Sequence, residues 1–248
     1  MNIEVSRVDV AVIVPLREIY RQEMNCQIVH DSFPGRGFSD PYVIRVEGEI
    51  AGYGLVANRH YPDAVHEFMT LRAHRGAALR MFRQLLEFSS AGKIRAQSND
   101  RLMLGMLHDC ATNITADAVL FTDAATTHLP CPGGTLSPVT EADHAGLFTH
   151  RHEPVGDWMI ERDGVAVATG GALFHYNPPY GDIYMEVHEA YRLRGYGSYL
   201  VQELKRICYE EGKIPAARCG ISNTASRLTL EKAGLLPCGH LLMGDLVR

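Results

Sequence analysis

The segment MEVHEAYRLRGYGSYL, residues 185–200, decides how the rest of the chain is interpreted. A strand pattern precedes its two glycines, and a helix pattern follows them. Such a turn directs several backbone N–H groups at one point, where the helix dipole is positive. Gly195 and Gly197 allow the backbone to approach a ligand closely, and Arg192 and Arg194 add positive charge. The segment therefore predicts a binding site for a phosphate-bearing ligand.

The charge around this segment also favours an anionic ligand. Between residues 192 and 232, eight Lys or Arg outweigh four Glu, whereas the whole chain of 248 residues carries a net charge of −5. A basic region on an acidic protein fits a local anion site. The acidic balance of the whole chain argues against nucleic acid as a partner.

Extended and helical patterns continue outward from the segment in a regular order. An alternating run before it ends at His188, and a helix after it ends at Gly212. Asp163-Gly164 is a typical hairpin turn, and Ser222-Asn223 is a typical helix start. The predicted strands of this half cover 156–162, 164–174, 182–188 and 216–221, and extended residues run from 235 to 247.

The first half repeats the same order of elements. Arg75-Gly76 corresponds to Arg194-Gly195, and Ser98-Asn99 corresponds to Ser222-Asn223. We interpret this as a tandem duplication. The Pro- and Gly-rich stretch in the middle marks a joint, which predicts a first domain at 1–127, a linker at 128–138 and a second domain at 139–248.

Residues 185–200 resemble the cofactor motif of the GNAT superfamily, the Gcn-type N-acetyltransferases. The family pattern R/Q-x-x-G-x-G/A is present as Arg192, Gly195 and Gly197, and Asn223 matches the family's next helix start. A K-x-G-F-like end follows as Lys232-Ala-Gly-Leu235. The resemblance covers residues 136–247 and is fainter in the first half. It implies an α/β fold of the α+β type, with two tandem GNAT-like domains, each a twisted mixed sheet flanked by helices and splayed at its centre.

The resemblance implies acetyl-CoA or coenzyme A as the ligand. The expected cofactor-binding residues are Val187, His188, Arg192, Leu193, Arg194, Gly195, Tyr196, Gly197, Ser198, Asn223 and Ser226. In the first half, Ala73 stands where the motif has its first arginine, which predicts a weaker cofactor site or none. The alternative is a second working site that uses Arg72 and Arg75.

Acyl transfer to an amine is helped by a general base. Asp182, Tyr184 and Glu186 alternate onto one face of their strand, and we expect Glu186 to be the base, with Asp182 in reserve. If the opposite, apolar face lines the site, neither carboxylate can serve. The position where many family members carry a tyrosine acid is Leu230 in this chain; Ser226, Ser222 or Cys219 could substitute.

The sequence thus predicts an acetyl-CoA-dependent N-acetyltransferase whose acceptor is a small-molecule or peptide amine. The alternative is a non-catalytic, acyl-CoA-binding regulatory protein. Six scattered cysteines and the isolated pair His150 and His152 predict neither a disulfide framework nor a metal site. No stretch reaches the roughly 20 apolar residues of a membrane span, and the N-terminus is not typical of a signal peptide. We therefore expect a cytoplasmic protein without membrane or nucleic-acid partners. A homodimer is one alternative to a monomer.

Overall fold

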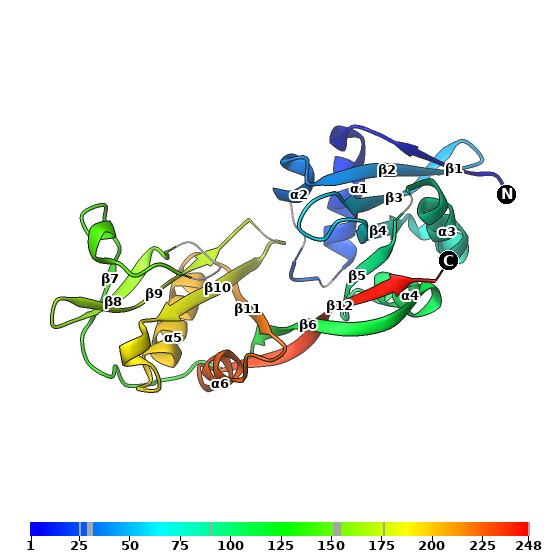
Figure 1. Ribbon diagram of the computed structural model, residues 1–248. Coiled ribbons are helices and arrows are strands. Elements are labelled where there is room, and N and C mark those ends of the chain that lie inside the picture. The colour runs from blue at the N-terminus through cyan, green and yellow to red at the C-terminus, as the bar shows by residue number, and fades with distance from the viewer. Residues whose placement is uncertain (25, 29–31, 90, 151–154, 176, 248) are drawn as a thin grey trace. The chain divides into compact units, whose positions relative to one another are not determined.

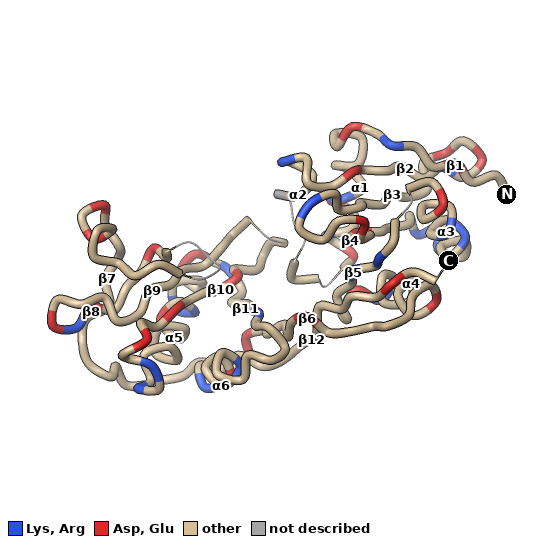
Figure 2. The backbone as a smooth tube through the Cα atoms, viewed as in Figure 1, with Lys and Arg blue, Asp and Glu red and all other residues tan. Residues whose placement is uncertain are grey.

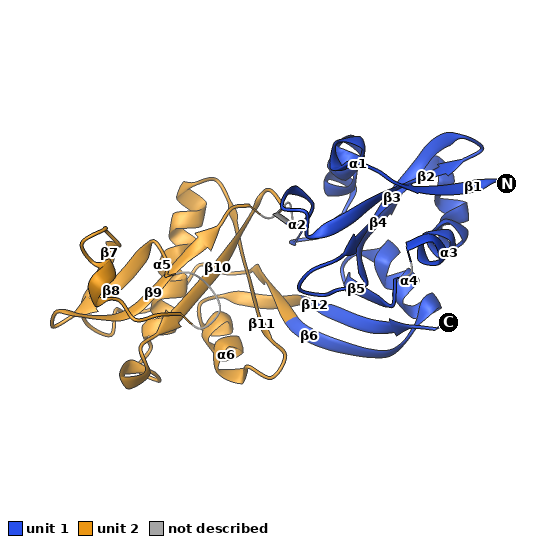
Figure 3. Ribbon diagram, turned by 45° about the horizontal axis from the view of Figure 1, so that its top comes forward, with its two compact units in different colours: residues 1–118, 239–248 blue, residues 119–238 orange. Residues whose placement is uncertain are grey.

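The computed structural model describes all residues except 25, 29–31, 90, 151–154, 176 and 248 (Figure 1). The chain forms two compact units (Figure 3). Unit 1 consists of Met1–Ala118 together with Gly239–Arg248, and unit 2 consists of Val119–Cys238. Each unit is a mixed sheet with helices packed on it, in agreement with the predicted fold class.

Unit 1 contains a sheet with the strand order β1-β2-β3-β4-β5-β12. Its strands are β1 (Ile3–Arg7), β2 (Ser39–Val46), β3 (Glu49–Ala57), β4 (Ala64–Thr70), β5 (Lys93–Gln97) and the last part of β12 (Leu235–Leu246). Its helices are α1 (Val10–Glu23), α2 (Ser32–Gly35), the 3₁₀ helix η1 (Arg72–Ala77), α3 (Ala78–Ser89) and α4 (Arg101–Cys110). The amphipathic α3 closes the core, where Phe82 meets Phe68 of β4 edge to face at 4.8 Å.

Unit 2 contains the strand order β6-β11-β10-β9-β8-β7. The strands are the last part of β6 (Ala111–Asp123), which begins in unit 1, together with β7 (Thr135–Pro138), β8 (Trp158–Arg162), β9 (Val165–Leu173), β10 (Tyr180–Val187) and β11 (Ile214–Gly220). The helices are η2 (His144–Gly146), η3 (Glu189–Tyr191), α5 (Tyr196–Glu210) and α6 (Thr224–Lys232). The hairpin predicted at Asp163-Gly164 is present, and both residues have positive φ, 51° and 75°.

A parallel strand pair separates in each unit. In unit 2, β10 pairs with β11 from Tyr180↔Ile214 to Ile183↔Ala217, but both strands continue beyond the last pair. In unit 1, the described pairs between β4 and β5 are Ala64↔Lys93 and Val65↔Ile94. We call the region beyond the last described pair the strand opening of each unit.

The compact units differ from the predicted division at residues 128–138. Residues Thr135–Pro138 form β7, and Gln202 of α5 accepts a hydrogen bond from the N–H of Leu129 at 2.6 Å. At the other end of the chain, Leu241–Asp245 of β12 pairs with β5, which places the last residues in unit 1. Turn composition alone did not reveal that a terminal strand completes the sheet of the other half.

The helix start predicted at Ser98-Asn99 lies one residue later. Asp100 caps α4, because its carboxylate accepts the N–H groups of Leu102 and Met103. Asp100 N–H bonds Gln97 O, just as Asn223 N–H bonds Gly220 O before α6. The structural equivalent of Asn223 is therefore Asp100. Among the described residues, no helix is long and apolar enough to cross a bilayer.

Candidate active site

The turn between β10 and α5 has the backbone shape that the glycine motif predicted. Leu193 and Gly195 both have positive φ, 61° and 92°, and α5 begins at Tyr196. The first hydrogen bond of α5 runs from Tyr199 N–H to Gly195 O. The N–H groups of residues 196–198 therefore come before the first carbonyl that the helix could offer them. These groups are available to an anion at the positive end of the helix dipole.

Two arginines flank this turn. Arg192 donates from Nε to the Val187 carbonyl at 3.2 Å, and the Arg194 guanidinium lies 5.4 Å from the centre of the Tyr191 ring. Both side chains are exposed, so these local contacts hold them near the turn without burying them. Figure 2 shows basic residues at the turn that leads into α5.

The predicted binding residues inside α5 present backbone groups, and not side chains, at the turn before the helix. The side chains of Tyr196 and Ser198 are buried, and Tyr196 Oη accepts a hydrogen bond from Arg162 at 3.0 Å. Gly197 has a packing reason that the sequence did not reveal. A Cβ there would lie 3.1 Å from Thr229 and 3.2 Å from Met185, so glycine lets α5 pack closely on β10 and α6.

The free edge of β10 supplies backbone groups on the side of the opening. Ile214 N–H bonds Pro179 O on that side, whereas His188 N–H bonds Val167 O of β9 on the other. Because backbone groups alternate along a strand, those of Met185 and Val187 face the opening. The backbone N–H of His188 is hydrogen-bonded to β9, and its side-chain Nδ1 accepts a hydrogen bond from the Ala190 N–H at 3.3 Å. Met185 was not among the predicted residues, although the alternation could have indicated it.

The two predicted catalytic carboxylates lie on the face of β10 that points away from α5. The opposite face, which carries Met185 and Val187, packs against the apolar core of unit 2. Asp182 is 8% exposed and lies 3.4 Å from Arg218 of β11, so it belongs to an ion pair at the closed end of the opening. Glu186 is half-buried and lies beyond the last strand pair, beside the opening itself.

A histidine covers this polar face. His150 is buried, and its Nε2 lies 2.5 Å from Oγ1 of Thr169, which is the direct partner of Glu186 on β9. The imidazole also meets the Tyr184 ring edge to face at 6.2 Å. The other histidine of the pair, His152, lies outside the described residues. Among the described residues, no three His, Cys, Asp or Glu side chains are grouped to hold a metal.

The start of α6 is built as predicted, but its tyrosine position is apolar. Asn223 Oδ1 accepts the Ser226 N–H at 3.1 Å and so caps the helix. Leu230 is 4% exposed and packs in the core. Burial raises the pKa of the Cys219 thiol, which the charge of Arg227 and a hydrogen bond with Ser226 partly offset. Cys219 is therefore a neutral thiol at pH 7.

Comparisons with known proteins identify the family of the two halves of the chain. Residues 25–124 match the model of an acetyltransferase (GNAT) domain, and residues 123–235 match that of the acetyltransferase (GNAT) family. The comparison with curated proteins found no match.

Solved structures show the same fold along the whole chain. An acetyltransferase from the GNAT family of Colwellia psychrerythraea is 11% identical with a TM-score of 0.78, and all of both chains is covered. A tandem GNAT protein from the clavulanic acid biosynthesis pathway is 12% identical with a TM-score of 0.62, over 100% of this chain and 99% of that one. A GCN5-related N-acetyltransferase from Sphaerobacter thermophilus is 14% identical with a TM-score of 0.57, over 94% and 86%. The two family matches together run from residue 25 to residue 235, and the chain belongs to the GNAT acetyltransferases as a tandem member.

Proposed function

We propose that unit 2 transfers an acetyl group from acetyl-CoA to an amine. One observation carries this proposal: the strand opening beside Met185 and Val187 leads directly to the left-handed turn and free amides at the start of α5. An extended chain of amides that ends in a pyrophosphate matches this series of donors and acceptors. Bound there, acetyl-CoA supplies an acyl group activated as a thioester.

Each part of the cosubstrate has candidate partners in the chain. The backbone groups of Met185 and the N–H of Val187 fit the amides of the pantetheine arm, whereas the Val187 carbonyl already accepts a hydrogen bond from Arg192. The N–H groups of residues 196–198, with Arg192 and Arg194, fit the pyrophosphate. Asn223 marks the start of α6 across the opening and fits the acyl end less directly, because its Oδ1 already serves as the helix cap.

Glu186 is the base in this proposal. The amine nitrogen attacks the thioester carbonyl carbon, the carbon–sulfur bond breaks, and Glu186 takes the proton that the amine loses. Asp182 is less suited, because Arg218 already holds it. Leu230 offers no proton to the departing sulfur, and the low pKa of a thiol lets the sulfur leave as a thiolate, which takes its proton from solvent.

Release of free thiol from acetyl-CoA tests the proposal. The purified protein is incubated with acetyl-CoA and a panel of small-molecule and peptide amines, and thiol release and acetylated amine are both measured. We expect turnover with at least one amine class, and we expect Glu186→Gln to slow it strongly while acetyl-CoA still binds. Thiol release without acetylated amine would be hydrolysis and would contradict amine transfer.

The buried Leu230 favours one other candidate, a non-catalytic acyl-CoA-binding protein. Such a protein would bind acetyl-CoA in the same opening but would acetylate no amine in the panel. The two candidates therefore differ in turnover and not in affinity.

A further inference from the structure

The turn of unit 1 that corresponds to the phosphate turn of unit 2 has a different backbone. Residues Arg72–Ala77 form a 3₁₀ helix that continues directly into α3, and none of the residues 71–78 has positive φ. His74 N–H already bonds Leu71 O, and Ala78 N–H bonds Arg75 O. The donors that lie before α5 in unit 2 are thus partly used inside the chain here.

A carboxylate neutralises the two arginines of this turn. Glu23, at the end of α1, forms an ion pair with Arg75 and lies 3.9 Å from Arg72. An incoming pyrophosphate would have to displace Glu23 from both guanidinium groups. In unit 2, Arg192 contacts a backbone carbonyl and Arg194 contacts an aromatic ring, and neither of these described contacts is with an anion.

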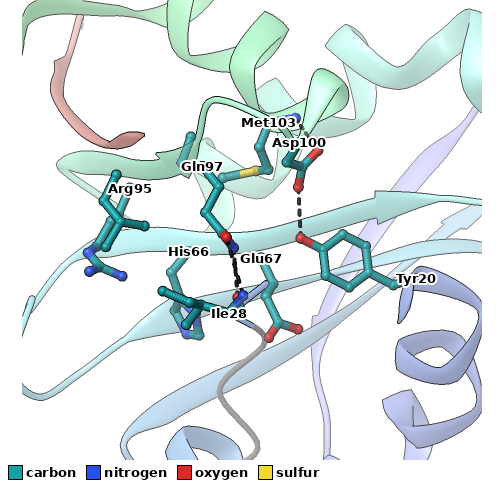
Figure 4. Close-up of a pocket in the computed structure, with 10 residues that line it drawn as sticks. Tyr20, Ile28, His66, Glu67, Arg95, Gln97, Asp100 and Met103 are labelled. Atoms are coloured by element: carbon teal, nitrogen blue, oxygen red, sulfur yellow. Dashed lines mark hydrogen bonds between the residues drawn. The ribbon is translucent and has the colours of Figure 1, made fainter. Parts of the chain in front are cut away.

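The chain itself closes the strand opening of unit 1. The side-chain amide of Gln97, at the end of β5, donates to Ile28 O at 2.6 Å and accepts from Ile28 N–H at 3.3 Å (Figure 4). The N–H and the C=O of Ile28 thus pair with the Gln97 side chain, in the way that an amide of a bound ligand would pair there. Beside them, Tyr20 of α1 donates to Asp100 at 2.7 Å (Figure 4).

Buried charges fill the adjacent space. The guanidinium of Arg17 makes two hydrogen bonds to the Glu67 carboxylate, at 2.8 and 2.9 Å, and Tyr53 donates to the same carboxylate at 2.9 Å. The cavity that remains between β4, β5 and the start of α4 measures about 20 Å³. That is the space of about one water molecule, far less than a pantetheine arm needs.

We propose that residues Cys26–Ile28, fixed by Gln97, plug the strand opening of unit 1, so that each chain binds one acyl-CoA, in unit 2. In unit 1, the space that corresponds to the ligand site of unit 2 is then filled by the unit's own buried polar side chains. The inference rests on the proposed function, because it assumes that acetyl-CoA binds in unit 2.

Hydrogen exchange of the full chain, measured with and without acetyl-CoA, tests the plug. We expect slower exchange in β10 and in the first turn of α5, and no change in β4, η1 or the start of α3. Equilibrium dialysis should give one acetyl-CoA per chain. The paired variant Arg72→Ala, Arg75→Ala should leave both the stoichiometry and the affinity unchanged.

Two outcomes would overturn the plug while the proposed function stands: two molecules bound per chain, or ligand protection that covers β4 and η1 as well as β10 and that the Arg72→Ala, Arg75→Ala variant removes from β4 and η1. No binding to the wild-type chain would instead contradict the proposed function. A further variant, Gln97→Leu, removes the two hydrogen bonds that fix Ile28. It should lower the melting temperature and leave the exchange protection by acetyl-CoA confined to unit 2.

Discussion

Lys205 is a single residue on which the packing of unit 2 depends. Its ammonium group is buried, lies 2.8 Å from the Asp123 carboxylate and donates to the carbonyls of Ala125 and Ala233 at 2.6 and 2.9 Å. One side chain on α5 thereby fixes the end of β6 and the end of α6. Nothing in the sequence distinguishes this lysine from the solvated ones, because its partners are distant in the chain.

Replacement of Lys205 by Met should lower the free energy of unfolding by about 3 kcal/mol, because it leaves a carboxylate and two carbonyls without their buried partner. Urea denaturation measures the change. Lys232→Met, at an exposed position, is the matched control and should change the free energy by less than about 0.5 kcal/mol. Equal effects of both variants would show that burial of the charge does not matter.

Glu186→Gln should lower kcat by about 100-fold, which is the low end for loss of a general base, with the affinity for acetyl-CoA unchanged. The comparison is Asp182→Asn, which breaks the ion pair with Arg218 and should mainly lower the melting temperature. Steady-state kinetics and calorimetry of both variants check this. If Asp182→Asn loses the turnover and Glu186→Gln keeps it, the two roles are reversed.

His66 should make unit 1 sensitive to acid. Burial, with the charges of Arg95 and Arg17, lowers the pKa of His66 from 6.5 to about 4, although Glu67 opposes the shift. Between these values the unfolded chain binds the extra proton, so the free energy of unfolding should fall as the pH drops from 6.5 to 4. The loss should be about 2 kcal/mol, discounted because the imidazole is only half-buried.

Denaturation at several pH values, with His66→Gln for comparison, measures this loss. The variant should show a flatter pH dependence in that window. A wild-type curve that is already flat there would mean that His66 is not desolvated as the structure indicates.

At the scale of elements, the phosphate turn depends on backbone conformation. Gly195→Ala forces a Cβ onto a residue with φ of 92°, which costs about 1–2 kcal/mol, and it should weaken acetyl-CoA binding by about tenfold. The counterpart in unit 1 is Gly76→Ala, where the added Cβ has no atom nearby and the residue has no positive φ. This variant should change neither the stability nor the affinity for acetyl-CoA. Thermal melts and titrations of the two variants check the contrast. Similar losses in both would contradict the difference between the two turns.

The elements show which parts of the fold a sequence can predict. Local signals, such as Asp163-Gly164 and the helix spacing after Gly195, predicted the hairpin and α5 because their causes are local. The cap at Asp100 was assigned one residue early, because Ser98-Asn99 is an equally good local signal. The glycine motif predicted the turn, yet Gly197 proved to serve helix packing, which depends on Met185 and Thr229.

At the scale of the whole molecule, the chain order and the compact units do not coincide. Long-range pairing of Leu241–Asp245 with β5 leaves no mark in composition or spacing, so the division at residue 128 could not be corrected from the sequence. The roles of Asp182 and His188 were likewise decided by partners on other strands. Arg218 and Val167 are identified only by strand register.

The fragment 1–127 should therefore not fold alone, because β5 would lose its partner strand and the core its contacts with Leu242 and Leu246. Circular dichroism and urea denaturation of the fragment test this. Addition of a peptide of residues 235–248 should restore a cooperative transition. A fragment that unfolds cooperatively without the peptide would contradict the assignment of the last strand to unit 1.

The most direct test of the central claim is a calorimetric titration of the full chain with acetyl-CoA, beside the variant Arg192→Ala, Arg194→Ala. Our account predicts one site per wild-type chain and at least a tenfold loss of affinity in the variant. Binding that the variant leaves unchanged, or no binding by the wild-type chain, would contradict a cosubstrate site at the turn before α5.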